Sequence, residues 1–155
     1  MTLWTENELS DEKVGLKKGL TVYAVCAAFY LALSVVLLVL SKGKEYFWFM
    51  AGDIALSVAF GWGSLWYFTN PFHERKSLIA LYGKMAVSPE YTETGPIKDI
   101  CEITKGGLLL YSVTINLGEQ ERVLNAFTKT FVGFEKGKSY VFKTRANVIV
   151  AGEEK

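Results

Sequence analysis

The sequence predicts a membrane α-helical hairpin of two transmembrane helices, followed by a small, mainly antiparallel β domain of the OB-like or SH3-like barrel kind. Half of the 155 residues are hydrophobic, and the long apolar runs are confined to residues 20–68. A link of only five residues, 41–45, separates two of these runs and forces them to run antiparallel. After residue 77 the apolar runs are short, rich in β-branched and aromatic residues, and interrupted by glycine, which is typical of strands in a small barrel.

Residues 1–19 form the first predicted part, an amphipathic lead-in to the membrane. Thr5 and Glu8 have the spacing of a capping box, and Trp4 and Leu9 have that of a hydrophobic staple. We expect a short helix on the membrane surface here, and a regulatory arm is the alternative.

The hairpin, residues 20–70, contains predicted spans at 20–40 and 46–68. The first span has 21 residues without a formal charge, which is enough to cross the roughly 30 Å hydrocarbon core and too long for a typical signal peptide. The second span carries aromatic residues at both ends, where membrane proteins place their interfacial anchors, and Asn70-Pro71 ends it.

Basic residues flank the hairpin more heavily than they populate its loop. Two lysines lie in the loop, at positions 42 and 44. Six basic residues flank the spans: Lys13, Lys17, Lys18, Arg75, Lys76 and Lys84. By the positive-inside rule, both termini and the β domain are predicted to be cytoplasmic. Several bacterial families share this architecture, so the predicted location is a bacterial cell membrane.

Small residues recur at every fourth position in both spans and define one candidate face of the hairpin. They are Ala24, Ala28, Ala32, Ala51, Ala55, Ala59 and Gly63. Such stripes let helices approach each other closely in lipid. In an antiparallel helix pair, the residue numbers of two facing positions always add up to the same sum. Here pairs such as Ala28 and Ala59 sum to 87, and the implied midpoint falls inside the loop.

Polar residues define the opposite face of each span. They are Tyr23, Cys26, Tyr30 and Ser34 in the first span, and Asp53, Ser57 and Ser64 in the second. The same sum sets three pairs level with each other: Ser34 with Asp53, Tyr30 with Ser57, and Tyr23 with Ser64. The hairpin can therefore close through its small residues or through its polar residues, and the sequence leaves both arrangements open.

Asp53 has the most to gain from closure through the polar residues, because it carries the only carboxyl group in the two spans. A charged carboxylate near the centre of a span costs about 2.5–3.5 kcal/mol on insertion scales. Three interpretations remain open: a hydrogen bond within the hairpin to Ser34 or Tyr30, burial against a second copy or another membrane protein, and a proton or ion relay. A relay normally needs several ionisable groups, and Asp53 is the only one in either span.

The β domain, residues 77–152, contains six predicted strands. They cover residues 78–87, 98–104, 108–117, 122–132, 139–144 and 147–151. Turns are expected at 94–96, 105–107, 117–119 and 135–138. Residues 119–134 also fit a helix packed on a sheet, so strand and helix both remain possible there.

No residue pattern in the chain predicts catalysis, a cofactor or a metal site, and we expect a non-enzymatic protein. His73 is the only histidine, which excludes histidine-based triads and multi-histidine metal sites. The segment Gly133-Phe-Glu-Lys-Gly-Lys-Ser139 differs from a phosphate-binding loop, because only three residues separate its glycines and a strand-like sequence follows.

Basic residues form a second candidate surface, on the last part of the β domain. They are Lys129, Lys136, Lys138, Lys143 and Arg145. The interleaved aromatic residues are typical of a half-buried strand with lysines on its solvated face. Contact with anionic lipid headgroups is the next interpretation, and nucleic acid is the third.

The leading functional prediction is a membrane-anchored interaction or scaffold protein whose β domain binds protein or lipid headgroups. Its hairpin is expected to assemble with itself or with a larger membrane protein. The first alternative is an accessory subunit of a membrane transport system that uses Asp53. The second is a membrane-tethered barrel that binds nucleic acid.

Overall fold

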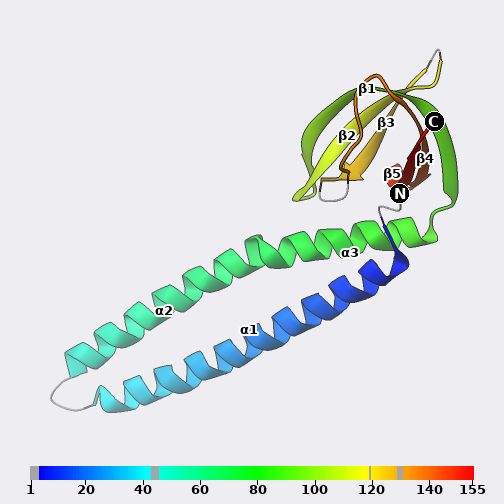
Figure 1. Cartoon of the computed structure of the whole chain (residues 1–155). Helices are drawn as coiled ribbons and strands as arrows, with labels where there is room; N and C mark the ends of the chain where they lie inside the picture. Colours follow the sequence, from blue (N-terminus) through cyan, green and yellow to red (C-terminus); the bar gives the residue numbers. More distant parts are fainter. Residues whose placement is uncertain (1–3, 43–45, 119, 129–130) are drawn as a thin grey trace. The chain divides into compact units, whose positions relative to one another are not determined.

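The computed structural model describes residues 4–42, 46–118, 120–128 and 131–155, arranged in two compact units (Figure 1). The helical unit consists of Val14–Arg75. The β unit combines Lys76–Lys155 with the start of the chain, Met1–Lys13. Both ends of the chain therefore contribute to one unit.

A single long helix, α1 (Glu6–Leu40), runs from the β unit into the helical unit. The predicted helix start is confirmed, because α1 begins directly after Thr5. No break separates the expected lead-in from the apolar run, since Gly15 and Gly19 are isolated glycines that a helix tolerates. Trp4 is buried and Leu9 packs against the same cluster, as expected of a hydrophobic staple.

Two further helices follow, α2 (Tyr46–Thr69) and α3 (Pro71–Val87). The Asn70-Pro71 junction ends α2 as predicted, and the proline becomes the first residue of α3, where its missing N–H is tolerated. The strand predicted over residues 78–87 is wrong, because α3 covers it. Tyr82 and Met85 are three residues apart and both buried, so the helical period decides the structure of this short apolar run.

Five strands form one sheet in which every neighbouring pair is antiparallel except β3 and β5. The strands are β1 (Glu90–Lys105), β2 (Leu108–Asn116), β3 (Glu121–Phe127), β4 (Ser139–Arg145) and β5 (Val148–Glu154). Their order, β1-β2-β3-β5-β4, closes because β4 pairs back with β1. The strands predicted at 108–117 and 139–144 are confirmed within one residue. Strands are also confirmed at 98–104 and 147–151, but β1 begins eight residues before the predicted start and β5 ends three residues after the predicted end.

Strand β1 pairs with two different strands along its length. Residues 90–96 pair with β4, and residues 97–105 pair with β2. The turn predicted at 94–96 is wrong, because those residues lie inside β1. A Cβ on Gly95 would lie 2.2 Å from the backbone oxygen of Asn116, so this glycine permits a close approach between strands. The turn predicted at 105–107 is confirmed, with Gly106 and Gly107 both at positive φ.

Within the uncertain stretch 119–134, residues 121–127 form strand β3. β3 ends at Phe127, so the strand predicted to reach Val132 is too long. Described residues beyond it contribute side chains to the core: the rings of Phe131 and Phe134 stack with centroids 4.4 Å apart. A Cβ on Gly152 would lie 2.8 Å from the ring of Phe134, so this ring packs tightly on β5.

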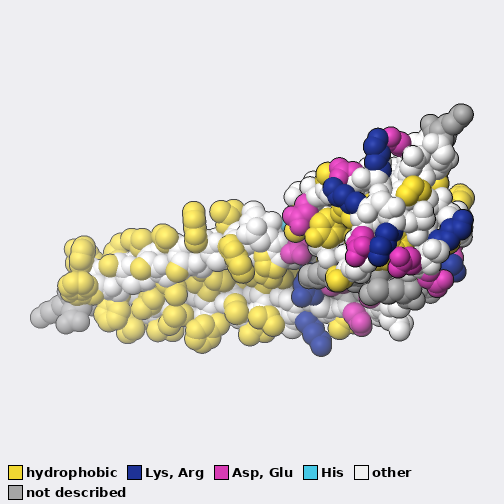
Figure 2. Space-filling model, turned by 45° about the horizontal axis from the view of Figure 1, so that its top comes forward, with side chains coloured by type: hydrophobic (Ala, Val, Ile, Leu, Met, Phe, Trp, Pro, Cys, Tyr) yellow, Lys and Arg dark blue, Asp and Glu magenta, His cyan; other side chains and the backbone are white. Residues whose placement is uncertain are grey.

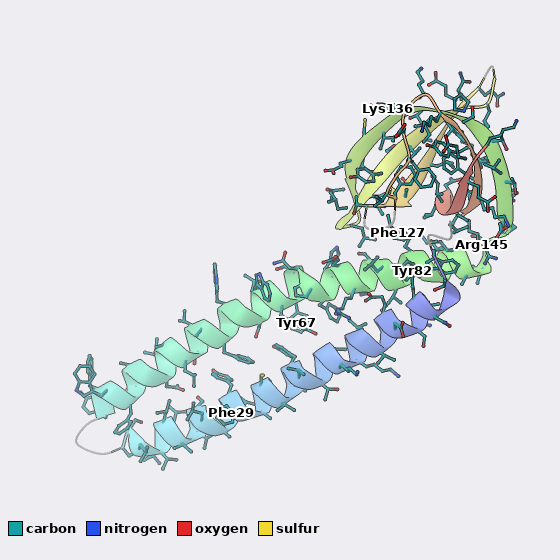
Figure 3. The ribbon with its side chains drawn as sticks, viewed as in Figure 1. Phe29, Tyr67, Tyr82, Phe127, Lys136 and Arg145 are labelled. Carbon is teal, nitrogen blue, oxygen red and sulfur yellow. The ribbon has the colours of Figure 1, made fainter. Side chains whose placement is uncertain are left out.

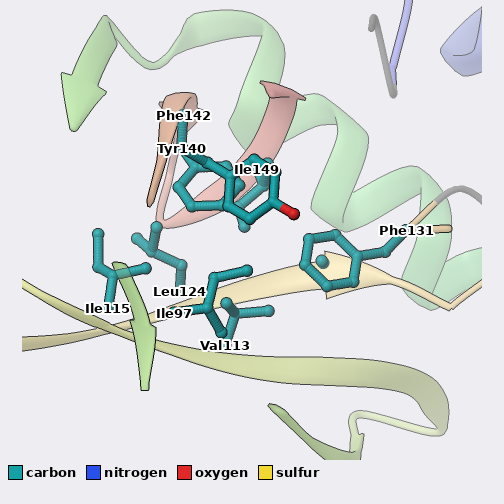
Figure 4. Close-up of a cluster of buried hydrophobic side chains, with 9 residues drawn as sticks. Ile97, Val113, Ile115, Leu124, Phe131, Tyr140, Phe142 and Ile149 are labelled. Carbon is teal, nitrogen blue, oxygen red and sulfur yellow. The ribbon is translucent and has the colours of Figure 1, made fainter. Parts of the chain in front are cut away.

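The main core lies inside the closed sheet (Figure 4). Its buried members are Ile97, Val113, Ile115, Leu124, Ala126, Phe131, Tyr140, Phe142 and Ile149. A second cluster joins α3 and the chain start to the outside of β5, and its buried members are Trp4, Tyr82, Met85, Val148 and Val150.

Candidate functional site

The helical unit closes through its polar residues. Three hydrogen bonds join α1 and α2, and we call them the polar ladder. Ser34 donates to a carboxylate oxygen of Asp53 at 2.5 Å, the hydroxyls of Tyr30 and Ser57 lie 2.9 Å apart, and Tyr23 donates to the Ser64 hydroxyl at 3.1 Å. These are the three pairs whose numbers sum to 87. The geometry thus places every predicted polar pair within hydrogen-bonding distance.

Aromatic rings fill the space around the polar ladder. The rings of Tyr30 and Phe60 stack at 4.4 Å, and those of Tyr23 and Tyr67 stack at 5.4 Å. Tyr67 lies on the side of α2 that faces α1, where a Cβ on Gly19 would be 2.7 Å from its hydroxyl (Figure 3). Gly19 was not among the predicted contact residues, because it lies outside the fourfold spacing of the small residues.

The small-residue face of the hairpin points outward. Its alanines are all exposed, and a Cβ added to Gly63 would meet nothing within 4 Å. Of the two closures left open by the sequence, the structure has the polar one. The physical reason is that hydroxyl and carboxyl groups gain partners inside the hairpin, whereas alanine methyl groups lose little by facing outward.

The rest of the helical surface is apolar. Figure 2 shows hydrophobic side chains along the helical unit and charged ones gathered over the other part of the chain. Phe29, Trp48 and Trp62 are each more than 70% exposed. Such an area is too large for an ordinary water-facing surface. Within α1, Asn7–Leu40 is long and apolar enough to cross a membrane, and among the described residues it is the helix that meets this criterion.

The predicted basic surface is largely neutralised by acidic partners. Lys136 pairs with Asp99, Lys138 lies 2.9 Å from Glu135, and Lys143 lies 3.4 Å from Glu90. Arg145 lies 3.5 Å from the same Glu90 carboxylate, with its guanidinium carbon 5.9 Å from the centroid of the Trp4 ring. Lys129 lies outside the described residues. Asp99 and Glu90 belong to β1, so their proximity to these basic residues could not be read from the local sequence.

This pairing changes the protonation of exposed groups. The hydrogen bond from Lys136 lowers the pKa of Asp99 to about 2, with a smaller contribution from the Cys101 thiol. The same pair raises the pKa of Lys136, and the Glu135 carboxylate raises the pKa of Lys138. These basic groups therefore remain charged, but neighbouring carboxylates offset their positive charge.

An ion pair between a buried carboxylate and a partly exposed arginine in the β unit was not predicted. The carboxylate of Glu93 is 5% exposed and lies 2.9 Å from the guanidinium of Arg122. Thr144 donates a hydrogen bond to it at 3.3 Å. Glu93, Gly95 and Ile97 alternate along β1 and share its buried face. This alternation is the sequence feature from which the burial of Glu93 could have been predicted. The second carboxylate oxygen of Glu93 has no hydrogen-bond partner within the described structure.

The described part of the chain contains no group of three or more His, Cys, Asp or Glu residues placed to hold a metal ion. Cys26 and Cys101 are free and exposed. Comparison with protein-family models finds no match, and comparisons with curated proteins and with solved structures find no significant match either.

Proposed function

We propose that this chain is a two-pass membrane protein whose α1 and α2 both span the bilayer. The observation that carries the proposal is the position of Trp4. Its indole is 6% exposed and packs in one cluster with Tyr82, Met85 and Val150. If α1 crossed the membrane alone, Trp4 and these partners would lie on opposite sides. Because they pack together, a membrane-spanning α1 would require the chain to return through α2, which supports the two-pass proposal.

Further contacts support the shared side of the two chain ends. Burial raises the pKa of Tyr82, and a hydrogen bond with Glu8 in the first turns of α1 raises it further. We therefore place both termini and the β unit on the same side, and the flanking basic residues favour the cytoplasmic side of a bacterial cell membrane. The closed five-strand order and the parallel β3–β5 pair favour a barrel of the OB-like class.

The function that this architecture supports best is a non-enzymatic interaction or scaffold protein. The polar ladder is satisfied inside the hairpin, which leaves the small-residue face for another membrane helix. We infer that this face binds a second copy of the chain or a larger membrane protein, because small residues allow close helix contact in lipid. The β unit is then available to a protein or lipid headgroups on the cytoplasmic side.

The topology is tested by labelling cysteines with a membrane-impermeant maleimide in intact cells and in inverted vesicles. The native Cys101 reports the side of the β unit, Lys42→Cys reports the hairpin tip, and Cys26 is replaced by alanine. We expect the two cysteines to label from opposite sides. Labelling of both from the same side contradicts the two-pass proposal.

The interaction is tested by crosslinking in native membranes at natural expression. We expect a discrete crosslinked oligomer or heteromer that disappears when Ala28 and Ala59 are both replaced by leucine. Val22→Leu, an exposed position on another side of α1, is the matched control and should retain it. A monomer in the wild-type membrane argues against an interface on this face.

The transport alternative has one supporting feature, a carboxyl group within an apolar helix. Asp53→Asn separates the two proposals, because an amide keeps the hydrogen bond with Ser34 and cannot relay protons. The nucleic-acid alternative gains no support from the basic residues, since the four that are described have acidic partners.

A further inference from the structure

The β unit contains a groove that combines an apolar lining with two lysines. It has a volume of about 340 Å³ and lies between α3 and the β1–β2 turn. Leu81, Leu108, Leu110 and Val148 line it with apolar atoms. Lys84 and Lys105 also line it, one from α3 and one from the end of β1. Sites for small molecules have this combination of an apolar lining with a few convergent polar groups, and the mouths of barrels are common places for them.

The two groove lysines differ from the other described lysines of the strands and of the loops between them, which have acidic partners. Elsewhere in the β unit, Lys98 pairs with Glu121, and Lys136, Lys138 and Lys143 also pair with carboxylates. Among the residues that the structure describes, neither Lys84 nor Lys105 has an acidic partner. Two uncompensated ammonium groups beside an apolar groove are complementary to an amphiphilic anion, whose charged head pairs with the lysines while its apolar part covers the leucines.

We propose that this groove binds the phosphate headgroup region of an anionic membrane phospholipid. The short distance along the chain between the groove and the second span indicates that the anion comes from the membrane. Ser77, which lines the groove, lies eight residues after Thr69, the last residue of α2. Eight residues of helix extend only about 12 Å, so the groove is tethered close to the end of the second span. This inference rests on the proposed membrane insertion and deepens it by naming the lipid contact.

Each side chain then has a defined part. Lys84 and Lys105 pair with the phosphate oxygens, as point charges rather than as a bidentate clamp. Leu81, Leu108 and Leu110 contact the glycerol backbone and the first methylene groups. Asn125 is already engaged, since its amide donates to the backbone oxygen of Asn147 at 3.4 Å, and it contributes shape only.

The test uses the full chain in phosphatidylcholine nanodiscs that contain a small fraction of photoactivatable phosphatidylglycerol, with the diazirine near the glycerol. Labelled peptides are identified by mass. We expect labelling of the peptide that carries Leu108 and Leu110, in addition to labelling of α1 and α2. Charge reversal of both groove lysines, Lys84→Glu with Lys105→Glu, should reduce the groove labelling at least fivefold and leave the helix labelling unchanged.

A matched control reverses two paired lysines instead, Lys98→Glu with Lys136→Glu, and should retain the groove labelling. Circular dichroism checks that each variant is folded. Photoactivatable phosphatidylcholine should label the helices but not the groove, and excess inorganic phosphate should not compete. Groove labelling that survives the Lys84 and Lys105 reversals, or that free phosphate removes, overturns the proposal. Absent labelling of α1 and α2 would instead refute the membrane insertion on which it rests.

Discussion

The two units of this chain distribute polarity in opposite ways. The helical unit has hydroxyls and a carboxylate between its helices and apolar side chains on its surface. The β unit has an apolar interior, while its surface carries paired charges such as Lys98 and Glu121. This is the pattern expected if one unit is surrounded by hydrocarbon and the other by water.

If the helical unit lies in lipid, the same kind of contact contributes differently to the stability of each unit. In water, burial of apolar surface drives folding, and exposed ion pairs contribute little. In lipid, apolar side chains gain nothing by leaving the surroundings, so packing and hydrogen bonds between helices decide the arrangement. Matched substitutions in the two units test how much burial and polar contacts contribute to the stability of each.

The largest expected effect concerns one substitution made in each unit. Phe142→Ala removes a fully buried ring from the core of the β unit and should lower its free energy of unfolding by about 3–5 kcal/mol. Phe29→Ala removes a ring that is 71% exposed on α1 and should change it by less than about 0.5 kcal/mol. Urea unfolding of the full chain in detergent, followed by circular dichroism, measures both. Equal losses would contradict the assignment of α1 as a lipid-facing helix.

The next effect compares two ion pairs of the β unit, one with a buried carboxylate and one on the surface. Glu93→Gln removes the charge partner of Arg122 and should cost about 2 kcal/mol, less than the 3–5 expected for a fully buried pair because Arg122 is partly exposed. Glu121→Gln breaks an exposed pair with Lys98 and should cost no more than about 0.5 kcal/mol. Both values come from the same urea unfolding experiment. A larger cost for Glu121→Gln would reverse the expected order.

A smaller effect is expected in the polar ladder. Asp53→Leu removes the acceptor of the Ser34 hydroxyl and should destabilise the helical unit by about 1 kcal/mol, a typical value for hydrogen bonds between membrane helices. Asp53→Asn keeps an acceptor and should be close to neutral. Titration with sodium dodecyl sulfate, monitored by tryptophan fluorescence from α2, measures both. If Asn is as damaging as Leu, the negative charge itself is required.

The smallest effect is a pH dependence on the surface of the β unit. The pKa of Asp99 is lowered to about 2, so the folded state binds the proton less readily than the unfolded chain. The resulting stabilisation is present above the ordinary carboxyl pKa of about 4 and is lost as the pH falls toward 2. NMR titration of the Asp99 side chain should give this low pKa, and Lys136→Gln should raise it. An unchanged pKa in that variant would exclude Lys136 as the cause.

Local pattern and register predicted much of this arrangement. The constant sum of 87 identified the pairs of the polar ladder, because a short loop leaves an antiparallel hairpin little freedom of register. It could not choose between the polar and small-residue closures, since both satisfy the same sum. Hairpin strands such as β2 were found because alternation and glycine turns are local signals.

The errors lie where distant parts of the chain decide the outcome. Residues 78–87 contain a short apolar run that suits either period, and packing against Trp4 and Val148 resolves it as helix α3. Gly95 was assigned to a turn because the strand segment that approaches it, at Asn116, is distant in sequence. The neutralisation of Lys136 and Lys143 depends on β1 residues that the closed sheet brings beside them.

The burial of Trp4 also has a consequence for biosynthesis. Its partner Val148 is synthesised 144 residues after Trp4. At about 5–20 residues per second, the indole remains without its native contacts for roughly 7 to 30 s. During that interval the β unit cannot complete its second cluster. The cluster that buries Trp4 can therefore form only after β5 has been synthesised, even though α1 and α2 precede β5 in the chain.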